Sequence, residues 1–155
     1  MTTIKRLLYI SILAPMMLAS GCDTGDNNLP TKPVEEECYI GTLSVDQNDG
    51  TFYYQDEVKT TYEIVGDRLN FVMYKVKFAT GMPLKLNMFV DGVDYTEEEG
   101  TYTLSGNGLV PHALGGPFEE FTITNLSGRL TEESFTLEFI CGDYPVTYTG
   151  KMREP

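Results

Sequence analysis

The stretch FTLEFICGDYPVTYTG, residues 135–150, decides the fold of this 155-residue chain. Its first half alternates apolar and polar residues, so Phe135, Leu137 and Phe139 share one face, as in a half-buried β-strand. The segment CGDYP is rich in turn residues, and VTYTG then alternates again with Tyr148 on the apolar face. The stretch therefore predicts an antiparallel hairpin with one face in an apolar core.

The same period of two continues backwards to residue 38 and predicts six more strands. In the last of them the apolar parity slips between Ile123 and Leu126, which predicts a β-bulge near Asn125. No window shows sustained helical periodicity with caps. The six expected strands are 38–46, 52–65, 69–79, 84–91, 101–106 and 121–130.

Eight sequential strands with one apolar face each predict an all-β domain, either an up-and-down antiparallel β-barrel or a sandwich. Short connections favour the barrel of about eight strands, because Greek-key sandwiches need long crossovers. The interior of such a barrel is just wide enough to be filled by side chains or to hold one small ligand.

The faces expected to point inward are aliphatic and aromatic. Strand 69–79 is expected to turn Tyr74 inward and Phe71 and Met73 outward, where they would join Phe89 and Ile140 in an apolar outer patch. Strands 69–79, 84–91, 135–141 and 146–150 place no charged residue inside, so a general acid or base is missing there and no enzyme activity is expected. The expected ligand-binding lining is Tyr62, Tyr74, Val76, Leu86, Met88, Tyr102, Phe135, Phe139 and Tyr148.

The chain before the barrel resembles a secretory signal followed by a tether. Lys5 and Arg6 precede an apolar run, residues 7–19, that is short of the roughly 20 residues needed to span a bilayer. Residues 1–21 are therefore expected to be a signal peptide. Residues 22–37, rich in Asp, Asn, Pro and Glu, are expected to form a flexible tether.

The sequence LASGC, residues 18–22, resembles a bacterial lipobox. The resemblance implies cleavage before Cys22 and acylation of this residue, which anchors the protein to a membrane without a spanning helix. The alternative is ordinary secretion with Cys22 as a free thiol. A lipoprotein of the cell envelope, held at the outer membrane, is the expected location, with the periplasmic and surface faces both open.

The charge of the chain excludes one class of partner. It carries 23 acidic and 11 basic residues, a net charge of −12 at pH 7, and the basic residues are scattered. Nucleic acid and anionic lipid headgroups repel such a surface, so nucleic-acid binding is excluded.

The runs YIGTLSV, YEIVGDRLNFVMYKVKF, MPLKLNMFVDGV and FTLEFICGDYPVTYTGK resemble the calycin-like domain, a lipocalin-related β-barrel family of lipoproteins in Bacteroides-type bacteria. The resemblance covers residues 38–151 and rests on strand rhythm and turn placement. It implies a calycin-type barrel domain over residues 38–155 and, by analogy, small-molecule binding. Fold similarity alone does not carry a function.

Other chemistry-bearing residues give weaker indications. Cys38 and Cys141 would form a disulfide in an oxidising compartment only if the topology brought them together, and eight strands place them at opposite ends. His112 is the only histidine and lies in a Gly- and Pro-rich loop without selected partners for catalysis. The acidic run 91–99 departs from calcium-loop spacing, so no metal or cofactor is expected.

Two functions remain open from the sequence. The first is a membrane-anchored lipoprotein whose barrel binds a small apolar or amphipathic molecule. The alternative is a non-catalytic accessory subunit of a cell-surface complex, with a filled barrel that offers only its outer surface to an envelope protein partner.

Overall fold

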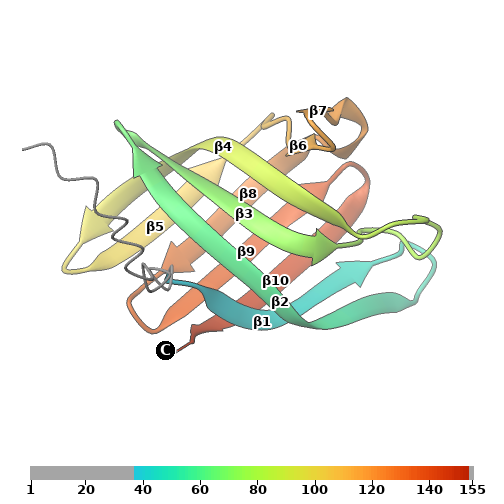
Figure 1. Ribbon diagram of the computed structural model, residues 1–155, viewed down its shortest axis with the longest axis horizontal. Helices are drawn as coiled ribbons and strands as arrows, with labels where there is room; N and C mark the ends of the chain where they lie inside the picture. Colours follow the sequence, from blue (N-terminus) through green and yellow to red (C-terminus); the bar gives the residue numbers. More distant parts are fainter. Residues whose placement is uncertain (1–36, 154–155) are drawn as a thin grey trace, which may run out of the picture. The chain divides into compact units, whose positions relative to one another are not determined.

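The computed structural model describes residues 37–153, which form an all-β domain (Figure 1). It has eight long strands, and two very short strands and one turn of 3-10 helix lie between the fifth and the sixth of them. The elements are β1 (Tyr39–Asp46), β2 (Phe52–Val65), β3 (Arg68–Val76), β4 (Leu86–Glu98), β5 (Thr101–Gly106), β6 (His112–Ala113), β7 (Gly116–Pro117), η1 (Glu119–Phe121), β8 (Ile123–Leu130), β9 (Ser134–Cys141) and β10 (Tyr144–Met152).

The eight long strands form a closed antiparallel barrel of up-and-down topology. Each long strand pairs with the next long strand along the chain, and β10 returns to pair with β1. Closure leaves none of these strands as a free edge of the sheet. The predicted fold class is therefore confirmed. The expected strand 101–106 has the same bounds as β5, whereas β4 runs seven residues beyond the expected end at 91.

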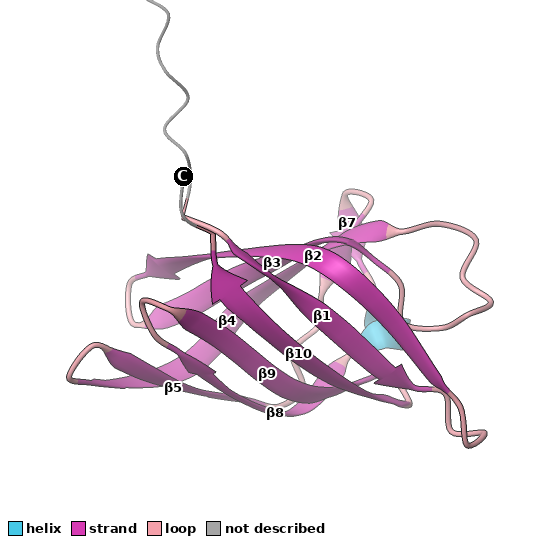
Figure 2. Cartoon of the chain, turned by 90° about the horizontal axis from the view of Figure 1, so that it is seen from below, coloured by secondary structure: helices cyan, strands magenta, loops and turns pink. Residues whose placement is uncertain are grey.

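The two ends of the barrel differ. One end, called here the hairpin end, carries the tight turns 66–67, 99–100 and 131–133. The opposite end, called here the loop end, carries the β3–β4 loop (77–85) and the β5–β8 connection (107–122). Figure 2 shows β7 and η1 together at the loop end. The longest connections of the described chain are therefore gathered at one mouth of the barrel.

The predicted bulge near Asn125 is present. Asn125 has a φ of 51°, and the register between β8 and β9 shifts between Thr124 and Ser127. Ile123 and Leu126 are both buried, one on each side of the bulge. The extra residue brings both side chains into the core, as the parity slip predicted.

A second bulge makes the predicted faces of β3 wrong. Lys75 has a φ of 54°, and the β3–β4 register shifts between Met73 and Val76. The bulge keeps Val76 in the core but reverses the parity of every residue before it. Phe71 and Met73, expected outside, are therefore core residues with 1% and 0% exposure.

Tyr74 consequently lies outside the barrel rather than in its lining. The Nζ of Lys59 lies 5.0 Å from the centre of the Tyr74 ring, and the Tyr74 hydroxyl lies 3.3 Å from Thr61 Oγ1. Lys59 and Thr61 alternate along β2 with the core residue Val58 and face away from it. Of the expected apolar outer patch, only Phe89 and Ile140 remain on the outer face, so the patch as predicted does not exist.

Cys38 and Cys141 are both free thiols. The backbone N–H of Arg153, just beyond β10, donates to the carbonyl of Cys38 at 3.0 Å, which places Cys38 at the hairpin end. Cys141 ends β9 at the loop end and pairs with Tyr144, the first residue of β10. The nine residues of β10 separate the two thiols by roughly 25–30 Å, far beyond disulfide reach.

Candidate ligand-binding site at the loop end

The centre of the barrel is filled by aromatic rings. The ring of Phe135 makes edge contacts with four others: its centre lies 5.5 Å from that of Tyr39, 6.3 Å from Tyr62, 6.1 Å from Phe71 and 6.2 Å from Tyr148. Such contacts contribute about 0.5–1.5 kcal/mol each beyond their burial. A ligand could enter this part of the interior only by displacing these rings.

The hydroxyls of two interior tyrosines are already bonded to the backbone. Tyr39 donates to the carbonyl of Thr131 at 2.7 Å, and the Tyr148 hydroxyl lies 3.1 Å from the carbonyl of Val58. Burial raises the pKa of Tyr148 to about 12 and also raises that of Tyr39. Both hydroxyls therefore stay protonated and serve the fold, because their protons are held by carbonyl oxygens.

The remaining residues of the expected lining are divided between core and mouth. Tyr62 and Tyr102 are partly buried and pack against the core. Leu86 is the only member of the expected lining that contributes to the open pocket described below. The members of the expected lining that lie in the core are Val76, Met88, Phe135, Phe139 and Tyr148.

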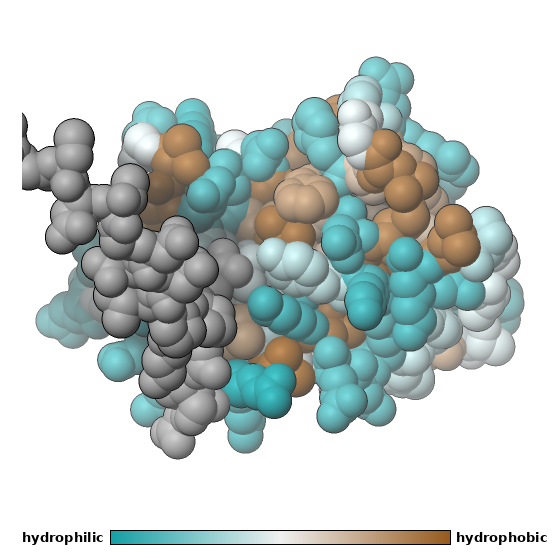
Figure 3. Space-filling model, in the orientation of Figure 1, coloured by the Kyte–Doolittle hydropathy of each residue, from teal (hydrophilic) through white to brown (hydrophobic). Residues whose placement is uncertain are grey.

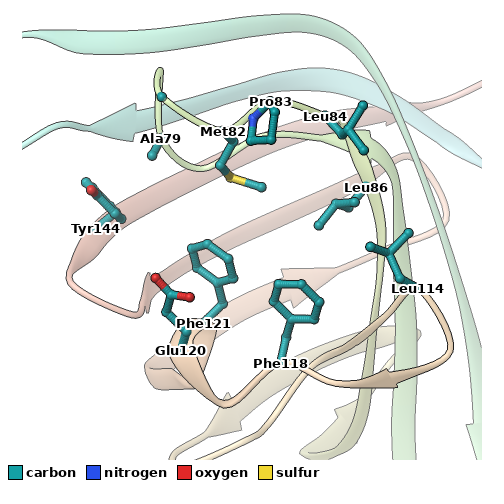
Figure 4. Close-up of a pocket in the computed structure, with 11 residues that line it drawn as sticks. Ala79, Met82, Pro83, Leu84, Leu86, Leu114, Phe118, Glu120, Phe121 and Tyr144 are labelled. Carbon is teal, nitrogen blue, oxygen red and sulfur yellow. The ribbon is translucent and has the colours of Figure 1, made fainter.

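An open apolar pocket of about 380 Å³ lies at the loop end. Its walls come from the β3–β4 loop, the β6–β7 hairpin, η1 and the start of β10, and Figure 4 shows their side chains converging on one space. A volume of this size suits a small ligand. The lining residues are Ala79, Gly81, Met82, Pro83, Leu84, Leu86, Leu114, Phe118, Glu120, Phe121 and Tyr144.

The wall from the β3–β4 loop is held in place by Gln47. The backbone N–H of Thr80 donates to Gln47 Oε1 at 3.1 Å, and Gln47 Nε2 donates to the carbonyl of Phe78 at 3.3 Å. Inside the loop, the backbone N–H of Phe78 lies 3.2 Å from Met82 Sδ. These contacts fix the Met82 side chain over the barrel interior, where it forms part of the floor of the pocket.

The opposite wall is η1, which is tied to the turn between β9 and β10. The backbone N–H of Gly142 donates to the carbonyl of Thr122 at 3.0 Å. Gly142 has a φ of 61°, and a Cβ there would lie 2.6 Å from the carbonyl oxygen of Glu120, so only glycine fits. This close approach brings the stacked rings of Phe118 and Phe121, 5.7 Å apart, to the mouth of the barrel.

A smaller void of about 10 Å³ lies inward of the pocket. Met82, Leu86, Phe118 and Phe121 line both spaces, so their side chains separate the pocket from the barrel interior. A void this small holds about one water-sized sphere. The pocket is thus the mouth of the barrel, closed below by a floor of flexible and aromatic side chains.

Leu114 is the most unusual residue of the site. It stands with Gly115 in the two-residue turn between β6 and β7, where both have positive φ, 51° and 79°. Such turns favour Asn, Asp or Gly, and a bulky residue there is strained. The Leu114 side chain is also 76% exposed, although it lies on the pocket. Burial does not offset this strain, and a strained residue that persists beside a pocket suggests a functional role for its side chain.

Apolar side chains gather around this mouth on the outer surface. Figure 3 shows hydrophobic residues near the β6–β7 hairpin and the start of β4. Leu84 is 61% exposed, and Phe89, which pairs with His112 of β6, is 43% exposed. The mouth and its surroundings therefore form an apolar region of the surface.

Sequence reasoning missed most of this site. Met82 and Phe118 lie in segments expected to be loops, where period-two alternation says nothing about side-chain direction. Phe121 was expected to begin strand 121–130, but it lies in η1. One signal was available: the connection LVPHALGGPFEEF, residues 109–121, is unusually rich in apolar residues for an exposed loop. Such a loop must cover apolar surface or offer some of its own.

Residues singled out for other chemistry are not assembled into a site. His112 is exposed in β6, and the acidic residues Asp91, Asp94, Glu97, Glu98 and Glu99 are all exposed. Within residues 37–153, no three His, Cys, Asp or Glu side chains converge as a metal site would require. The same residues contain no helix with the length and apolarity needed to cross a membrane. Cys22 lies outside the described residues.

The chain matches no protein-family model, and neither a curated protein nor a solved structure is detectably similar to it.

Proposed function

We propose that this protein is a membrane-anchored envelope lipoprotein that binds a small apolar or amphipathic molecule in the pocket at the loop end of its barrel. The observation that carries the proposal is Leu114, a strained and exposed leucine on an open apolar pocket. The lipobox-like LASGC supports the anchoring, and the calycin-like strand rhythm supports the binding role by analogy.

The interior of the barrel is packed, so the mouth is where a ligand fits. Because Phe135 and its neighbouring rings fill the centre, a ligand resting on Phe118, Phe121 and Leu114 needs no displacement of core side chains. Binding there exchanges exposed apolar surface for contact at about 25 cal/mol per Å². The partly exposed site leaves one side of the ligand in water, which suits an amphipathic molecule.

The test uses the full chain carrying Cys22→Ser, which is not acylated, with the neutral apolar probe N-phenyl-1-naphthylamine. Probe fluorescence should rise on binding, and native mass spectrometry of the freshly purified protein should show a small-molecule adduct. Leu114→Asn should weaken probe binding about tenfold, through lost apolar contact, while leaving stability equal or higher because Asn accepts positive φ. Val65→Asn, which changes an exposed apolar residue at the hairpin end, is the matched control.

The accessory-subunit function is the second candidate. A filled interior favours it, and the exposed, stacked pair Phe52 and Tyr54, with ring centres 6.1 Å apart, offers a protein partner apolar surface elsewhere on the barrel. Absence of both adduct and probe binding would overturn the ligand-binding proposal in favour of this candidate. Equal loss of binding in Leu114→Asn and Val65→Asn would show that the probe does not occupy the pocket.

A further inference from the structure

We infer that the molecule bound at the loop end is a cationic amphiphile, with an ammonium group beside Glu120 and an apolar body that extends toward Leu84, Leu86 and Leu114. The inference rests on the proposed function and names the chemical class of its ligand. It follows from how charge, aromatic rings and aliphatic side chains are distributed around the pocket.

The pocket has a polar side and an aliphatic side. Figure 4 shows Glu120 and Tyr144 on one side and Leu84, Leu86 and Leu114 on the other. Met82, Phe118 and Phe121 lie between them. An elongated molecule with one polar end matches this order, because its apolar body would contact the leucines while its head lies near the carboxylate.

Glu120 is the only charged residue that lines the pocket. Within the part of the chain that the structure describes, the ion pairs both involve Arg68, far along the sequence, and no Lys or Arg pairs with Glu120. Lys77 and Lys85 belong to the β3–β4 loop but do not line the pocket, and Lys77 Nζ lies 3.4 Å from the carbonyl of Thr80. The carboxylate is therefore available to a ligand cation.

The position of Glu120 is set by the fold. Its carbonyl oxygen lies against Gly142, and the backbone of η1 is closed by hydrogen bonds from Phe121 to Phe118 and from Thr122 to Glu119. Glu120 is thus held next to Tyr144, which follows the same β9–β10 turn. Because the backbone of Glu120 is held in place, a ligand cation has only the exposed side chain of this residue to order.

Aromatic rings add a second attraction for a cation. The pocket contains the rings of Phe118, Phe121 and Tyr144, whose faces carry partial negative charge. A cation over such a ring gains about 0.5–1 kcal/mol at an exposed site. A carboxylate would meet repulsion from Glu120 instead, and the acidity of the whole chain, with a net charge of −12, adds to that repulsion.

The experiment compares three probes with the same ten-carbon chain: decyltrimethylammonium, decanol and decanoate. Each is tested for displacement of N-phenyl-1-naphthylamine from the Cys22→Ser chain at about 0.15 M salt, so binding is read at the site that the naphthylamine occupies. The ammonium should bind about tenfold more tightly than decanol, from a weak exposed ion pair and cation–π contact together. Decanoate should bind more weakly than decanol.

Two variants that each remove one negative charge distinguish the effect of Glu120 on binding from the effect of the net charge of the chain. Glu120→Gln should bring the ammonium to within about threefold of decanol, while leaving decanol binding unchanged. Glu98→Gln removes the same charge at the hairpin end and should preserve the tenfold preference. Equal effects of the two variants would overturn the inference, because the preference would then come from net charge alone.

The outcomes also separate this inference from the proposed function. If the three probes bind equally well and Leu114→Asn weakens all of them, the pocket binds ligands but the cationic class is wrong. A preference for decanoate would likewise refute the cationic class alone. If none of the probes displaces the naphthylamine and the naphthylamine itself does not bind, both proposals fail together.

Discussion

The side chain of Tyr148 folds over Gly150, two residues further along β10, so closely that a Cβ on Gly150 would meet the tyrosine hydroxyl. Gly150 also pairs with Gly41 across the β1–β10 ladder, and a Cβ on Gly41 would run into the backbone of β10. The missing side chain at Gly150 therefore leaves the space in which the Tyr148 ring lies, and Gly41 leaves room for the backbone of β10. From there its hydroxyl reaches the carbonyls of Tyr39 and Val58, at 3.3 and 3.1 Å.

Gly150→Ala should destabilise the barrel by about 2 kcal/mol, because the added methyl must displace a buried ring that is hydrogen-bonded at its far end. Denaturant unfolding of the Cys22→Ser chain measures the change. Gly116→Ala, at a glycine where a Cβ meets nothing within 4 Å, is the control and should change stability by less than about 0.5 kcal/mol. Equal stabilities of the two variants would show that Tyr148 does not occupy this space.

The protein should lose stability above about pH 9. Burial raises the pKa of Tyr148 and of Cys141 to about 12, whereas the unfolded chain ionises these groups near 10 and 8.5. A raised folded-state pKa contributes stability that is complete below the unfolded pKa and is lost as pH rises toward the folded one. By pH 12 the expected loss is therefore about 2 kcal/mol for Tyr148 and about 4 kcal/mol for Cys141, at about 1.36 kcal/mol per pKa unit.

The melting temperature, followed from pH 7 to pH 11.5, checks this dependence. Tyr148→Phe should lessen the alkaline decline, since it removes one of the buried groups whose pKa is raised in the folded protein. Tyr54→Phe changes an exposed tyrosine of β2 and should leave the decline as it is. An unchanged slope in Tyr148→Phe would contradict the assigned burial of its hydroxyl.

Cys38 and Cys141 should both react with a thiol reagent when the Cys22→Ser chain is unfolded without reductant, because they lie at opposite ends of the barrel. In the folded protein at pH 8, Cys141 should remain unreacted, since it is buried and its pKa is raised to about 12, so the thiolate is scarce. Counting modified thiols by mass spectrometry decides both points. Thiols that stay blocked after unfolding would indicate a disulfide and a different strand arrangement.

Cys22→Ser should move the protein from the membrane fraction to the soluble fraction, because acyl chains rather than a spanning helix are expected to hold it. Cys38→Ser, which changes a cysteine outside the lipobox-like motif, should leave the protein with the membranes. Immunoblots of separated membrane and soluble fractions measure the distribution. A Cys22→Ser protein that still fractionates with membranes would refute the lipoprotein anchoring.

The sequence alone determined the strands, their order and the class of the fold. Alternation at period two marks each strand. Short, turn-rich connections favour pairing between strands that are neighbours in the sequence. Such pairing gives an up-and-down meander that closes into a barrel. The bulge at Asn125 was predictable because polar residues surround Ile123 and Leu126, so the slip in parity is visible. In β3 both faces carry large apolar residues, and the bulge at Lys75 leaves no such trace.

Only the tertiary structure decided what the barrel encloses and where a ligand could bind. Alternation gives the direction of a side chain but not whether rings from β1, β2, β3, β9 and β10 meet in the middle, as they do around Phe135. The pocket likewise joins residues 79–86, 114–121 and 144, brought together by Gln47 on one wall and Gly142 on the other. These contacts link loops that lie far apart in the chain, and loop sequences carry no periodicity from which such packing can be inferred.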